Sequence, residues 1–499
     1  MAAVATFDEL EEQSLAPEDS GDTERLLPQE IKRSVWSVYS DISVLLVCLI
    51  TFTGDSSRGI LFPVLWPLCQ ALGGSVIDLG YLVAMFSLGR LVITTPLGYF
   101  CDVYRHRLSL IIANVVLIGG TLLWANSYHT RKIASLYFAQ FVLGVGSGSL
   151  GVTRSFVVEQ VEPAFRTRIV SLLTALQYAG FTVSPFLGSL LSNPKIDGTS
   201  GYWTFALPAY AVGFLAFLSL LGLVFQFKDI RTPKARSSRA QEGEPSASPE
   251  DALEMKKIII VMLFLNIATK GSIAVYETLG SQIGLVDYRL SSIQLGILIS
   301  LAGAAGTVQL LLFDSFWAKR FTDIQLILGG SVVMMLAQLF LINYGTVTSL
   351  ANFIIAVILM YTIGYPIAHT AVLGGFSKVQ KLGPQAALMG WFATAGSLAR
   401  IVLPIFSGYL DTVKDNSPFS IVLGMLTISY LGVIFLENRI RFWIEDLNED
   451  ERDAPLSNLQ KGQLLFMGAF FLFAMASLSF SSEVGPGLGD PDSWEIGDI

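Results

Sequence analysis

Charged residues are scarce in this sequence: only 14% of its 499 residues are Asp, Glu, Lys or Arg, whereas 52% are hydrophobic. A soluble protein usually carries about a quarter charged residues. The deficit falls in long runs without any charge, which indicates that lipid surrounds most of the chain. The acids behind the net charge of −8 gather near the two ends of the sequence, as is typical of solvated tails.

Cysteine is also rare, with only Cys48, Cys69 and Cys101 in or beside apolar runs. Such an odd, scattered set predicts neither a disulfide framework nor a metal site. The first forty residues are acidic and polar, unlike a cleavable signal peptide, so we expect the first span to target the chain to the membrane. No nucleophile–base pairing, metal-ligand cluster or phosphate-binding loop is evident. We therefore expect no enzyme, no cofactor or metal, and no nucleic-acid partner.

Long apolar runs make up most of the remaining sequence. A membrane-spanning helix needs about twenty mostly apolar residues, and the runs are continuous rather than alternating, which excludes a β-barrel. Twelve runs meet this requirement: 42–68, 77–100, 108–126, 134–157, 168–192, 202–226, 257–280, 291–313, 324–343, 349–373, 386–410 and 418–436. The sequence thus predicts an all-α, multi-pass membrane protein whose surroundings are the lipid bilayer.

Basic residues between the spans fall mostly on one side of the membrane. If the N-terminus is cytosolic, the cytosolic segments hold basic pairs such as Arg105 and Arg107 in nearly every loop. The opposite side holds only Arg131, Lys132, Lys195, Arg289 and Lys414. Because positive residues favour the cytosolic side, this asymmetry predicts a cytosolic N-terminus and an even number of spans up to residue 436.

One long polar linker divides the spans into six and six. The predicted organisation is an acidic N-terminal tail at 1–40, a six-helix bundle at 41–226, a cytosolic linker at 227–256, a second bundle at 257–437 and a C-terminal tail at 438–499. The fifth and eleventh spans share a similar pattern, "SPFLGSLL" and "LPIFSGYL", with Pro185 and Pro404 in matching places. Parallel six-span repeats are the architecture of major facilitator transporters.

A thirteenth apolar run, 464–480, is marginal as a span. Its seventeen residues would reach about 25 Å against a hydrocarbon core of about 30 Å. Acidic residues but no basic residue follow it, as expected of a tail that crosses the membrane. We predict a peripheral thirteenth helix outside both bundles.

Ionisable residues within the spans are functional candidates, because each costs at least about 2.5 kcal/mol at mid-membrane. The candidates are Asp55, Arg58, Arg90, Lys270, Glu277, His369 and Arg400. The third, sixth, ninth and twelfth spans carry no charge. This agrees with a major facilitator arrangement, in which those four helices are outer supports of a central cavity.

Cations outnumber acids among these residues. A cavity with surplus positive charge is unstable without an anion or water, and the arginine fork suits carboxylate or phosphate. We therefore predict that Arg58, Arg90, Lys270 and Arg400 bind an anionic solute. Alternatively, Arg90 and Arg400 have a structural role only.

Three residues are candidates to couple transport to protons: Asp55, Glu277 and His369. Histidine exchanges a proton near neutral pH. Other interpretations stay open. Asp55 and Arg58 are three residues apart and could neutralise each other on one helix face. His369 could equally be a hydrogen-bonded packing residue.

The second span ends in "GYFCDVYRHR", with Gly98, Asp102, Arg105 and Arg107. This run resembles the loop motif of the major facilitator superfamily, although Arg105 stands where the family often has Gly. The resemblance implies that these residues form a gate, with Asp102 near the start of the eleventh span and Arg154 as its partner. Alternatively, the two loop arginines only set the topology.

Further segments point to a particular branch of the superfamily. Gln140 stands in the fourth span where the family often has Arg, which puts an arginine-based proton relay there in doubt. The fifth span holds "GFTVSPFLG", similar to a Gly–Pro motif of antiporters. "LGYLVAMFSLGR", "VYETLG" and "GWFATAGSLARIVLPIFSG" resemble the ceroid-lipofuscinosis neuronal protein 7 branch, which are lysosomal facilitators similar to SPX-type transporters. This resemblance covers roughly residues 40 to 440.

The N-terminal tail contains "DTERLL", with Asp22, Leu26 and Leu27. It resembles an acidic dileucine signal, which sorting adaptors read on cargo bound for lysosomes or vacuoles. We therefore expect a lysosomal or vacuolar membrane protein and adaptors among its partners.

Three functions remain open from the sequence. The first is a monomeric secondary transporter of a small anion that works by alternating access. The second is an anion channel on the same scaffold, with the same arginines lining a pore. The third is a non-transporting sensor or scaffold that signals through its tails.

Overall fold

The computed structural model describes residues 41–160, 163–192, 201–228, 249–342, 349–379, 385–413 and 417–445. Within these ranges every regular element is a helix. The described helices belong to one compact unit, Ile42–Ile499. The dileucine residues, the linker from 229 to 248 and the apolar run 464–480 lie outside the described residues, so the predictions made for them stay predictions.

The first half of the chain forms the six predicted spans. Their elements are α3 (Ile42–Gly59), α4 (Phe62–Ala71), α5 (Val76–Tyr104), α6 (His106–Thr130), α7 (Ile133–Gly146), the 3₁₀ turn η1 (Ser147–Ser149), α8 (Leu150–Gln160), α9 (Pro163–Leu191) and α10 (Tyr202–Phe225). The first span is broken between α3 and α4, where Pro63 lies in the first turn of α4. Proline fits a first helical turn because its missing N–H is unpaired there anyway. The fourth span is interrupted by η1.

The second half of the chain forms the other six predicted spans. Its elements are α11 (Pro249–Gln282), η4 (Ile283–Asp287), α12 (Ser292–Leu311), η5 (Phe313–Trp317), α13 (Ala318–Arg320), α14 (Asp323–Leu339), α15 (Leu350–Ile358), η6 (Leu359–Gly364), α16 (Tyr365–Val379), α17 (Gln385–Val413), α18 (Ser417–Phe435) and α19 (Glu437–Glu445). The tenth span is not one regular helix, because the π-helical segment η6 separates α15 from α16. The short helix α19 was not predicted.

Ten helical stretches in the described residues are long and apolar enough to cross a membrane. The two remaining predicted spans correspond to α14, with 17 residues, and α9, with 29. Serine and threonine caps begin several of these helices. For example, Ser75 and Asp78 form a reciprocal capping box at the start of α5, which satisfies two N–H groups that have no partner within the helix.

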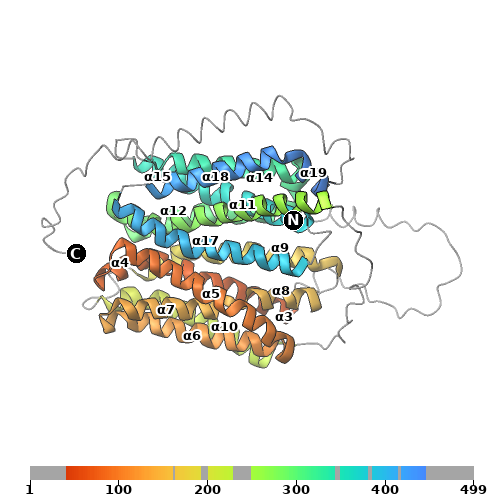
Figure 1. Cartoon of the computed structure of the whole chain (residues 1–499). Coiled ribbons are helices and arrows are strands. Elements are labelled where there is room, and N and C mark those ends of the chain that lie inside the picture. The colour runs from red at the N-terminus through yellow and green to blue at the C-terminus, as the bar shows by residue number, and fades with distance from the viewer. Residues whose placement is uncertain are drawn as a thin grey trace, which may run out of the picture. The chain divides into compact units, whose positions relative to one another are not determined.

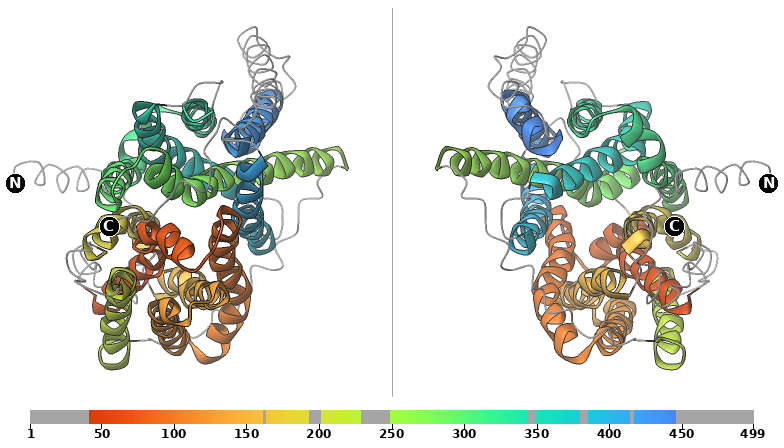
Figure 2. Two further views of the ribbon diagram at one scale, coloured as in Figure 1. Left: turned by 90° about the vertical axis from the view of Figure 1, so that its left-hand side faces the viewer. Right: turned by 90° about the vertical axis from the view of Figure 1, so that its right-hand side faces the viewer.

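The helices pack side by side, mostly along one direction (Figure 1). In the first half α3 packs against α9, and α5 and α6 both pack against α7; in the second half α11 packs against α17 and α18. Viewed end-on, the red to yellow helices gather on one side and the green to blue helices on the other (Figure 2). The halves meet where α5 packs on α17 and α9 packs on α12.

The halves pack closely near the start of α5 and the end of α17, which is the predicted non-cytosolic side. A Cβ on Gly80 would overlap the carbonyl oxygen of Pro404. Nearby, the hydroxyls of Tyr81 and Tyr409 lie 3.0 Å apart. Toward the predicted cytosolic end of α5, by contrast, a Cβ on Gly98 would meet nothing within 4 Å.

Candidate functional site

Five of the seven predicted intramembrane residues form one continuous chain of charges across the two halves. Arg90 lies 3.0 Å from Asp55, and Arg58 lies 3.2 Å from Glu277. Arg400 completes the chain by donating to the other carboxylate oxygen of Glu277. We call these five residues the charge chain. Asp55 and Arg58 lie 3.9 Å apart, so Arg90, rather than Arg58, is the closer partner of Asp55.

The charge chain is held by small residues and aromatic rings. Arg90 also donates to the hydroxyl of Ser147 at 3.1 Å, at the 3₁₀ turn of the fourth span. Gly144 allows this contact, since a Cβ there would overlap the Phe86 carbonyl oxygen on α5. The guanidinium of Arg58 lies 4.1 Å from the ring centre of Phe181, a favourable cation–π distance. The carboxylate side chains of Asp55 and Glu277 are only 1% and 3% exposed.

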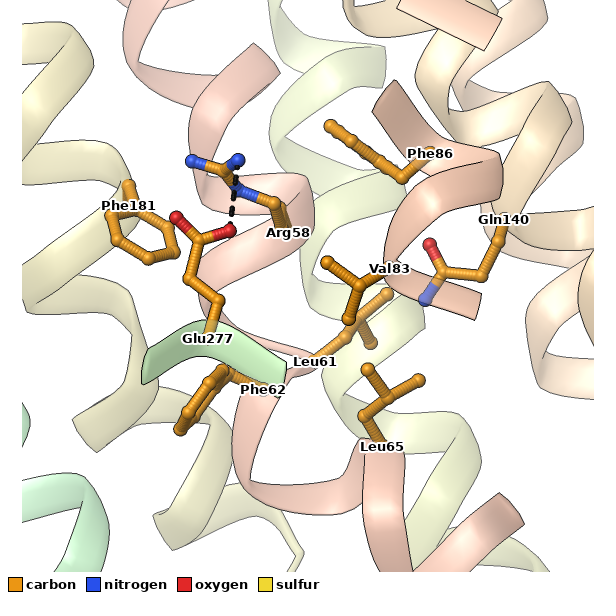
Figure 3. Close-up of a pocket in the computed structure, with 9 residues that line it drawn as sticks. All are labelled: Arg58, Leu61, Phe62, Leu65, Val83, Phe86, Gln140, Phe181 and Glu277. Atoms are coloured by element: carbon orange, nitrogen blue, oxygen red, sulfur yellow. Dashed lines mark ion pairs between the residues drawn. The ribbon is translucent and has the colours of Figure 1, made fainter. Parts of the chain in front are cut away.

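A small pocket adjoins the charge chain. It is lined by Arg58, Leu61, Phe62, Leu65, Val83, Phe86, Gln140, Phe181 and Glu277. Figure 3 shows the Arg58–Glu277 ion pair at one end of this pocket, with Gln140 across from it. The space between the side chains, including the part open to solvent, is about 320 Å³. Only three of the lining residues are polar, so this side of the charge chain is largely apolar.

Lys270 lies on the other side of the charge chain. It precedes Glu277 by seven residues on α11, which places it two turns, or about 10 Å, closer to the predicted cytosolic side. Its side chain lies over Gly396 of α17, where a Cβ would come within 2.7 Å of Nζ. Gly396 in turn precedes Arg400 by one helical turn. No carboxylate in the described part of the chain forms an ion pair with Lys270.

Two further basic residues lie at a similar depth. Arg154 follows Ser147 by seven residues along the fourth span, again about two turns beyond the charge chain, and donates to the Gln177 side chain at 3.3 Å. His369 stacks on Tyr365, with ring centres 5.2 Å apart. Lys270 is within electrostatic range of Arg154 and of His369. We call Arg154, Lys270 and His369 the basic layer.

Several buried polar atoms around these residues have no hydrogen-bond partner in the described residues. They are Asp55 Oδ2, Arg58 Nε, Arg400 Nε and His369 Nδ1, among others. An unsatisfied buried polar group costs about 1–3 kcal/mol. The region is therefore polar, unlike a closed hydrophobic core.

Contacts are described for two of the predicted gating side chains, Arg154 and Arg107. Asp102 lies on α5, but its side chain is not among those described, so its contact with the eleventh span stays a prediction. Arg154 donates to Gln177 and lies within electrostatic range of Asp55, but it forms no ion pair among the described residues. Arg107 donates to the Leu223 carbonyl at 2.9 Å and so binds the end of α10.

Arg105 takes a backbone conformation that favours glycine. Its φ of 78° and ψ of 170° fall in a region that is essentially reserved for Gly. The loop motif often has Gly at this position, so the turn between the second and third spans keeps its shape although the residue differs.

Sequence reasoning missed the residues that position the charges. Ser147, Gly396 and Gln177 were not singled out, and Phe181 was seen only as part of the "GFTVSPFLG" segment. Small polar or aromatic residues are common throughout the spans, so nothing in the sequence marks Ser147, Gln177 or Phe181. Gly396 could have been noticed by its spacing, one turn before Arg400.

Comparison with known proteins identifies a matching family and several relatives of similar length. A family model described as the Major Facilitator Superfamily matches residues 47–404. Major facilitator superfamily domain-containing protein 8 of Xenopus laevis is 21% identical over 83% of this chain and 93% of its own length. Quinolone resistance protein NorA of Staphylococcus aureus (strain COL) is 22% identical over 78% of this chain and 95% of its own length.

Solved structures with the same fold include two transporters. The human organic anion transporter MFSD10 covers 79% of this chain and 99% of its own, with a TM-score of 0.51 and 17% identity. A D-xylose–proton symporter covers 78% of this chain and 95% of its own, with a TM-score of 0.61 and 14% identity. At these identities the likeness concerns the fold alone.

Proposed function

Because the chain belongs to the Major Facilitator Superfamily, whose members are membrane transporters, we propose that it is a secondary transporter of an anionic solute that works by alternating access. The chain is a multi-pass integral membrane protein with the all-α major facilitator fold. The proposal therefore concerns what is carried and how, rather than the class of protein.

The excess of buried cations carries the proposal of an anionic solute. Arg58, Arg90 and Arg400 share only two carboxylates, which leaves one positive charge on the charge chain. Lys270 and Arg154 add two more, and neither forms an ion pair with a carboxylate among the described residues. Uncompensated charges in a low-dielectric interior are strongly unfavourable. An anion that enters from water would offset that cost.

Dense packing on one side supports a carrier rather than a channel. On the predicted non-cytosolic side, a Cβ on Gly80 would overlap Pro404, and a Cβ on Gly296 would overlap the Ser189 side chain. Ser300 also bonds the backbone of α9, donating to Val183 and accepting from Phe186, both at 2.9 Å. A pathway closed on one side fits a protein that exposes its site to each side in turn.

Glu277 is the favoured site of proton coupling. Its carboxylate accepts from Arg58 and Arg400 at once, so it already occupies the position that a solute anion would take. A solute that displaces Glu277 from Arg400 leaves the carboxylate in a largely apolar pocket, where protonation is favoured. Anion and proton would then move in the same direction. Tyr361 on η6 and Tyr365 on α16 are further ionisable groups within electrostatic range of Glu277.

A lysosomal or vacuolar membrane is the proposed location, with the N-terminus in the cytosol. The acidic dileucine pattern and the distribution of basic residues support it. Sorting adaptors and a monomeric state belong to the same proposal.

A flux measurement in reconstituted vesicles tests the function. We expect purified protein to carry at least one of labelled chloride, inorganic phosphate, sulfate or succinate, and a proton gradient to drive uptake. Glu277→Gln should keep anion exchange across the membrane but lose the stimulation by the gradient, because its side chain cannot take up a proton. Thr278→Val, the neighbouring position on α11, is the matched control and should keep the stimulation.

Three outcomes would contradict the proposal in different ways. Absence of flux for all four anions rules out the anionic solute. An ohmic current that exceeds any reasonable turnover identifies a channel. Gradient-driven uptake by Glu277→Gln at the wild-type rate moves the coupling site elsewhere.

A further inference from the structure

Only one end of the small pocket beside the charge chain carries charge. Six of its nine lining residues are apolar, and the polar ones are Arg58, Glu277 and Gln140. Arg58 and Glu277 pair with each other at 3.2 Å, so the rest of the lining is neutral. A solute group that enters the pocket can therefore be apolar or neutral, whereas a charged group would be buried there without a partner.

The pocket lies on the predicted non-cytosolic side of the arginines. Along the first span, which is predicted to start in the cytosol, Leu61 and Leu65 follow Arg58. Along α5, which runs back toward the cytosol, Val83 precedes Arg90. Beyond the pocket the two halves pack closely. A solute that arrives from the predicted cytosolic side therefore places its uncharged part in the pocket and keeps its charge beside the arginines.

The arginines of the charge chain have hydrogen-bond donors without a partner. Nε of Arg58 and Nε of Arg400 are buried, and neither bonds any atom of the described residues. The guanidinium of Arg58 also lies near two rings that line the pocket, 4.1 Å from the centre of Phe181 and 5.8 Å from that of Phe86. A carboxylate can accept from these guanidinium groups, and the carbon atoms attached to it then contact the same rings.

Gln140 lies at the opposite end of the pocket. Figure 3 shows its amide pointing into the pocket from across the Arg58–Glu277 pair, and the residue is buried. An amide donates and accepts hydrogen bonds but carries no charge. Gln140 therefore suits a neutral end of a solute and does not offset a second negative charge.

We propose that the solute is an organic monocarboxylate, whose carboxylate binds Arg58 and Arg400 while its short neutral body fills the pocket as far as Gln140. This inference rests on the proposed transport of an anion and adds which class of anion binds best. Chloride, phosphate and sulfate can still bind the arginines, but they leave the apolar part of the pocket without contacts. Succinate fills it but places a second charge there, so all four bind more weakly.

A pair of competitors tests the class of solute. Butanoate and succinate have the same number of carbon atoms and differ at the far end, where a methyl group stands in place of a second carboxylate. Either is added unlabelled to vesicles that exchange whichever labelled anion the protein carries. Equal internal and external pH keeps weak-acid permeation from acting through a proton gradient.

We expect butanoate to halve the exchange at a concentration at least about tenfold below that of succinate, because the pocket does not compensate the second charge. From acetate to butanoate, each added CH₂ should lower the half-inhibiting concentration about threefold to fourfold, as burial of apolar surface predicts.

Gln140→Arg should reverse the preference. A guanidinium at the far end supplies the partner that the second carboxylate lacks, so succinate should inhibit this variant at a lower concentration than butanoate does. Damage to the structure alone would weaken both competitors without exchanging their order.

A second variant tests the apolar lining and does not depend on the stability of Gln140→Arg. Val83→Thr places a hydroxyl among the apolar side chains at nearly constant size, and it should reduce the gain from acetate to butanoate. Val212→Thr makes the same change at a buried position of α10 that does not line the pocket. This matched control should keep the wild-type order and gain.

Failure of this inference can be told from failure of the proposed function. Succinate, phosphate or sulfate that competes as strongly as butanoate overturns the monocarboxylate class and leaves anion transport intact. An unchanged order of butanoate and succinate in Gln140→Arg, or an unchanged gain in Val83→Thr, overturns the placement of the solute in this pocket. Absence of flux for every labelled anion contradicts the proposed function, and the class of solute with it.

Discussion

Three arginines share two carboxylates at the centre of the membrane. This shortage of acids determines how a substitution of each residue affects stability and transport. Burying an ion pair gains little net stability, because desolvation offsets the attraction. Removing one partner is far more costly, since it leaves an uncompensated charge. The charge chain is therefore sensitive at every member, and loss of transport in a single variant does not by itself identify a solute contact.

A double variant separates the two roles of Arg400. Arg400→Gln alone should lose most transport but keep most of the stability, because Glu277 keeps Arg58 as a partner and the surplus positive charge is removed. Arg400→Gln combined with Glu277→Gln should be less stable by about 3–5 kcal/mol, since Arg58 then loses its partner at 3.2 Å and stays buried as an uncompensated charge. We expect transport to stay low in the double variant, because the solute loses its guanidinium.

Thermal unfolding in detergent and anion flux in vesicles measure these two effects. Arg90→Gln, with and without Asp55→Asn, is the parallel case at the other end of the charge chain. Full recovery of flux in the Arg400 double variant would reduce Arg400 to a structural partner of Glu277.

The sequence predicted which charged residues lie inside the spans better than how they pair. Because charges are scarce there, Asp55, Arg58, Arg90, Glu277 and Arg400 stood out, together with Lys270 and His369. Their pairing depends on how each helix is rotated and how close its neighbour lies. The suggested pairing of Asp55 with Arg58 followed from spacing along one helix, whereas Arg90 comes closer to Asp55 from α5.

At the scale of helices, the contact between α5 and α17 varies along its length. At one end Gly80 lets the backbones meet at Pro404, and at the other Gly98 faces open space. On α5, close packing therefore requires glycine at position 80 but not at position 98. The difference gives a matched pair of substitutions.

Gly80→Ala should disfavour the closed state on the predicted non-cytosolic side. The added methyl group overlaps the Pro404 carbonyl, and overpacking of this kind typically costs about 1–3 kcal/mol. Single cysteines introduced at exposed positions on that side should then react faster with an impermeant thiol reagent. Gly98→Ala should leave the labelling unchanged, since its methyl group meets no neighbour.

The same pair tests the loop motif. A loss of transport in Gly98→Ala without any change in labelling would show that Gly98 serves the gate suggested by the resemblance to the family, in a state that differs from the one described. Equal labelling of Gly80→Ala and wild type would instead mean that the two helices separate at little cost.

Helix positions were predictable to within a few residues for most spans, because length and hydropathy determine them. The breaks inside spans were not predicted. The π-helical segment at Leu359–Gly364 lies just before Pro366, which has no N–H to donate to the Thr362 carbonyl one turn earlier. That proline was a local signal for a break, but the hydrogen bond from Tyr178 to the Tyr361 carbonyl comes from the other half and could not be predicted from a local pattern.

For the molecule as a whole, location decides which solute the cavity meets. A transporter in an acidic organelle would work with a proton gradient directed toward the cytosol, and proton-coupled anion movement through Glu277 would then export the anion from the lumen. The same protein at the cell surface would face a much weaker gradient. The sorting signal and the coupling site therefore belong to one hypothesis.

Replacing Leu26 and Leu27 with Ala should move the protein to the cell surface, because acidic dileucine signals depend on both leucines to bind adaptors. Surface biotinylation of the tagged full chain measures the change, and we expect most of the variant at the surface. Ala at Leu10 and Leu15, which lie in the same acidic tail outside the motif, is the matched control and should leave the protein inside the cell. Intracellular retention of the Leu26 and Leu27 variant would show that the six-residue pattern is a chance match. Redistribution would also expose the predicted non-cytosolic side to the medium, where anion flux can be followed in whole cells at a chosen external pH.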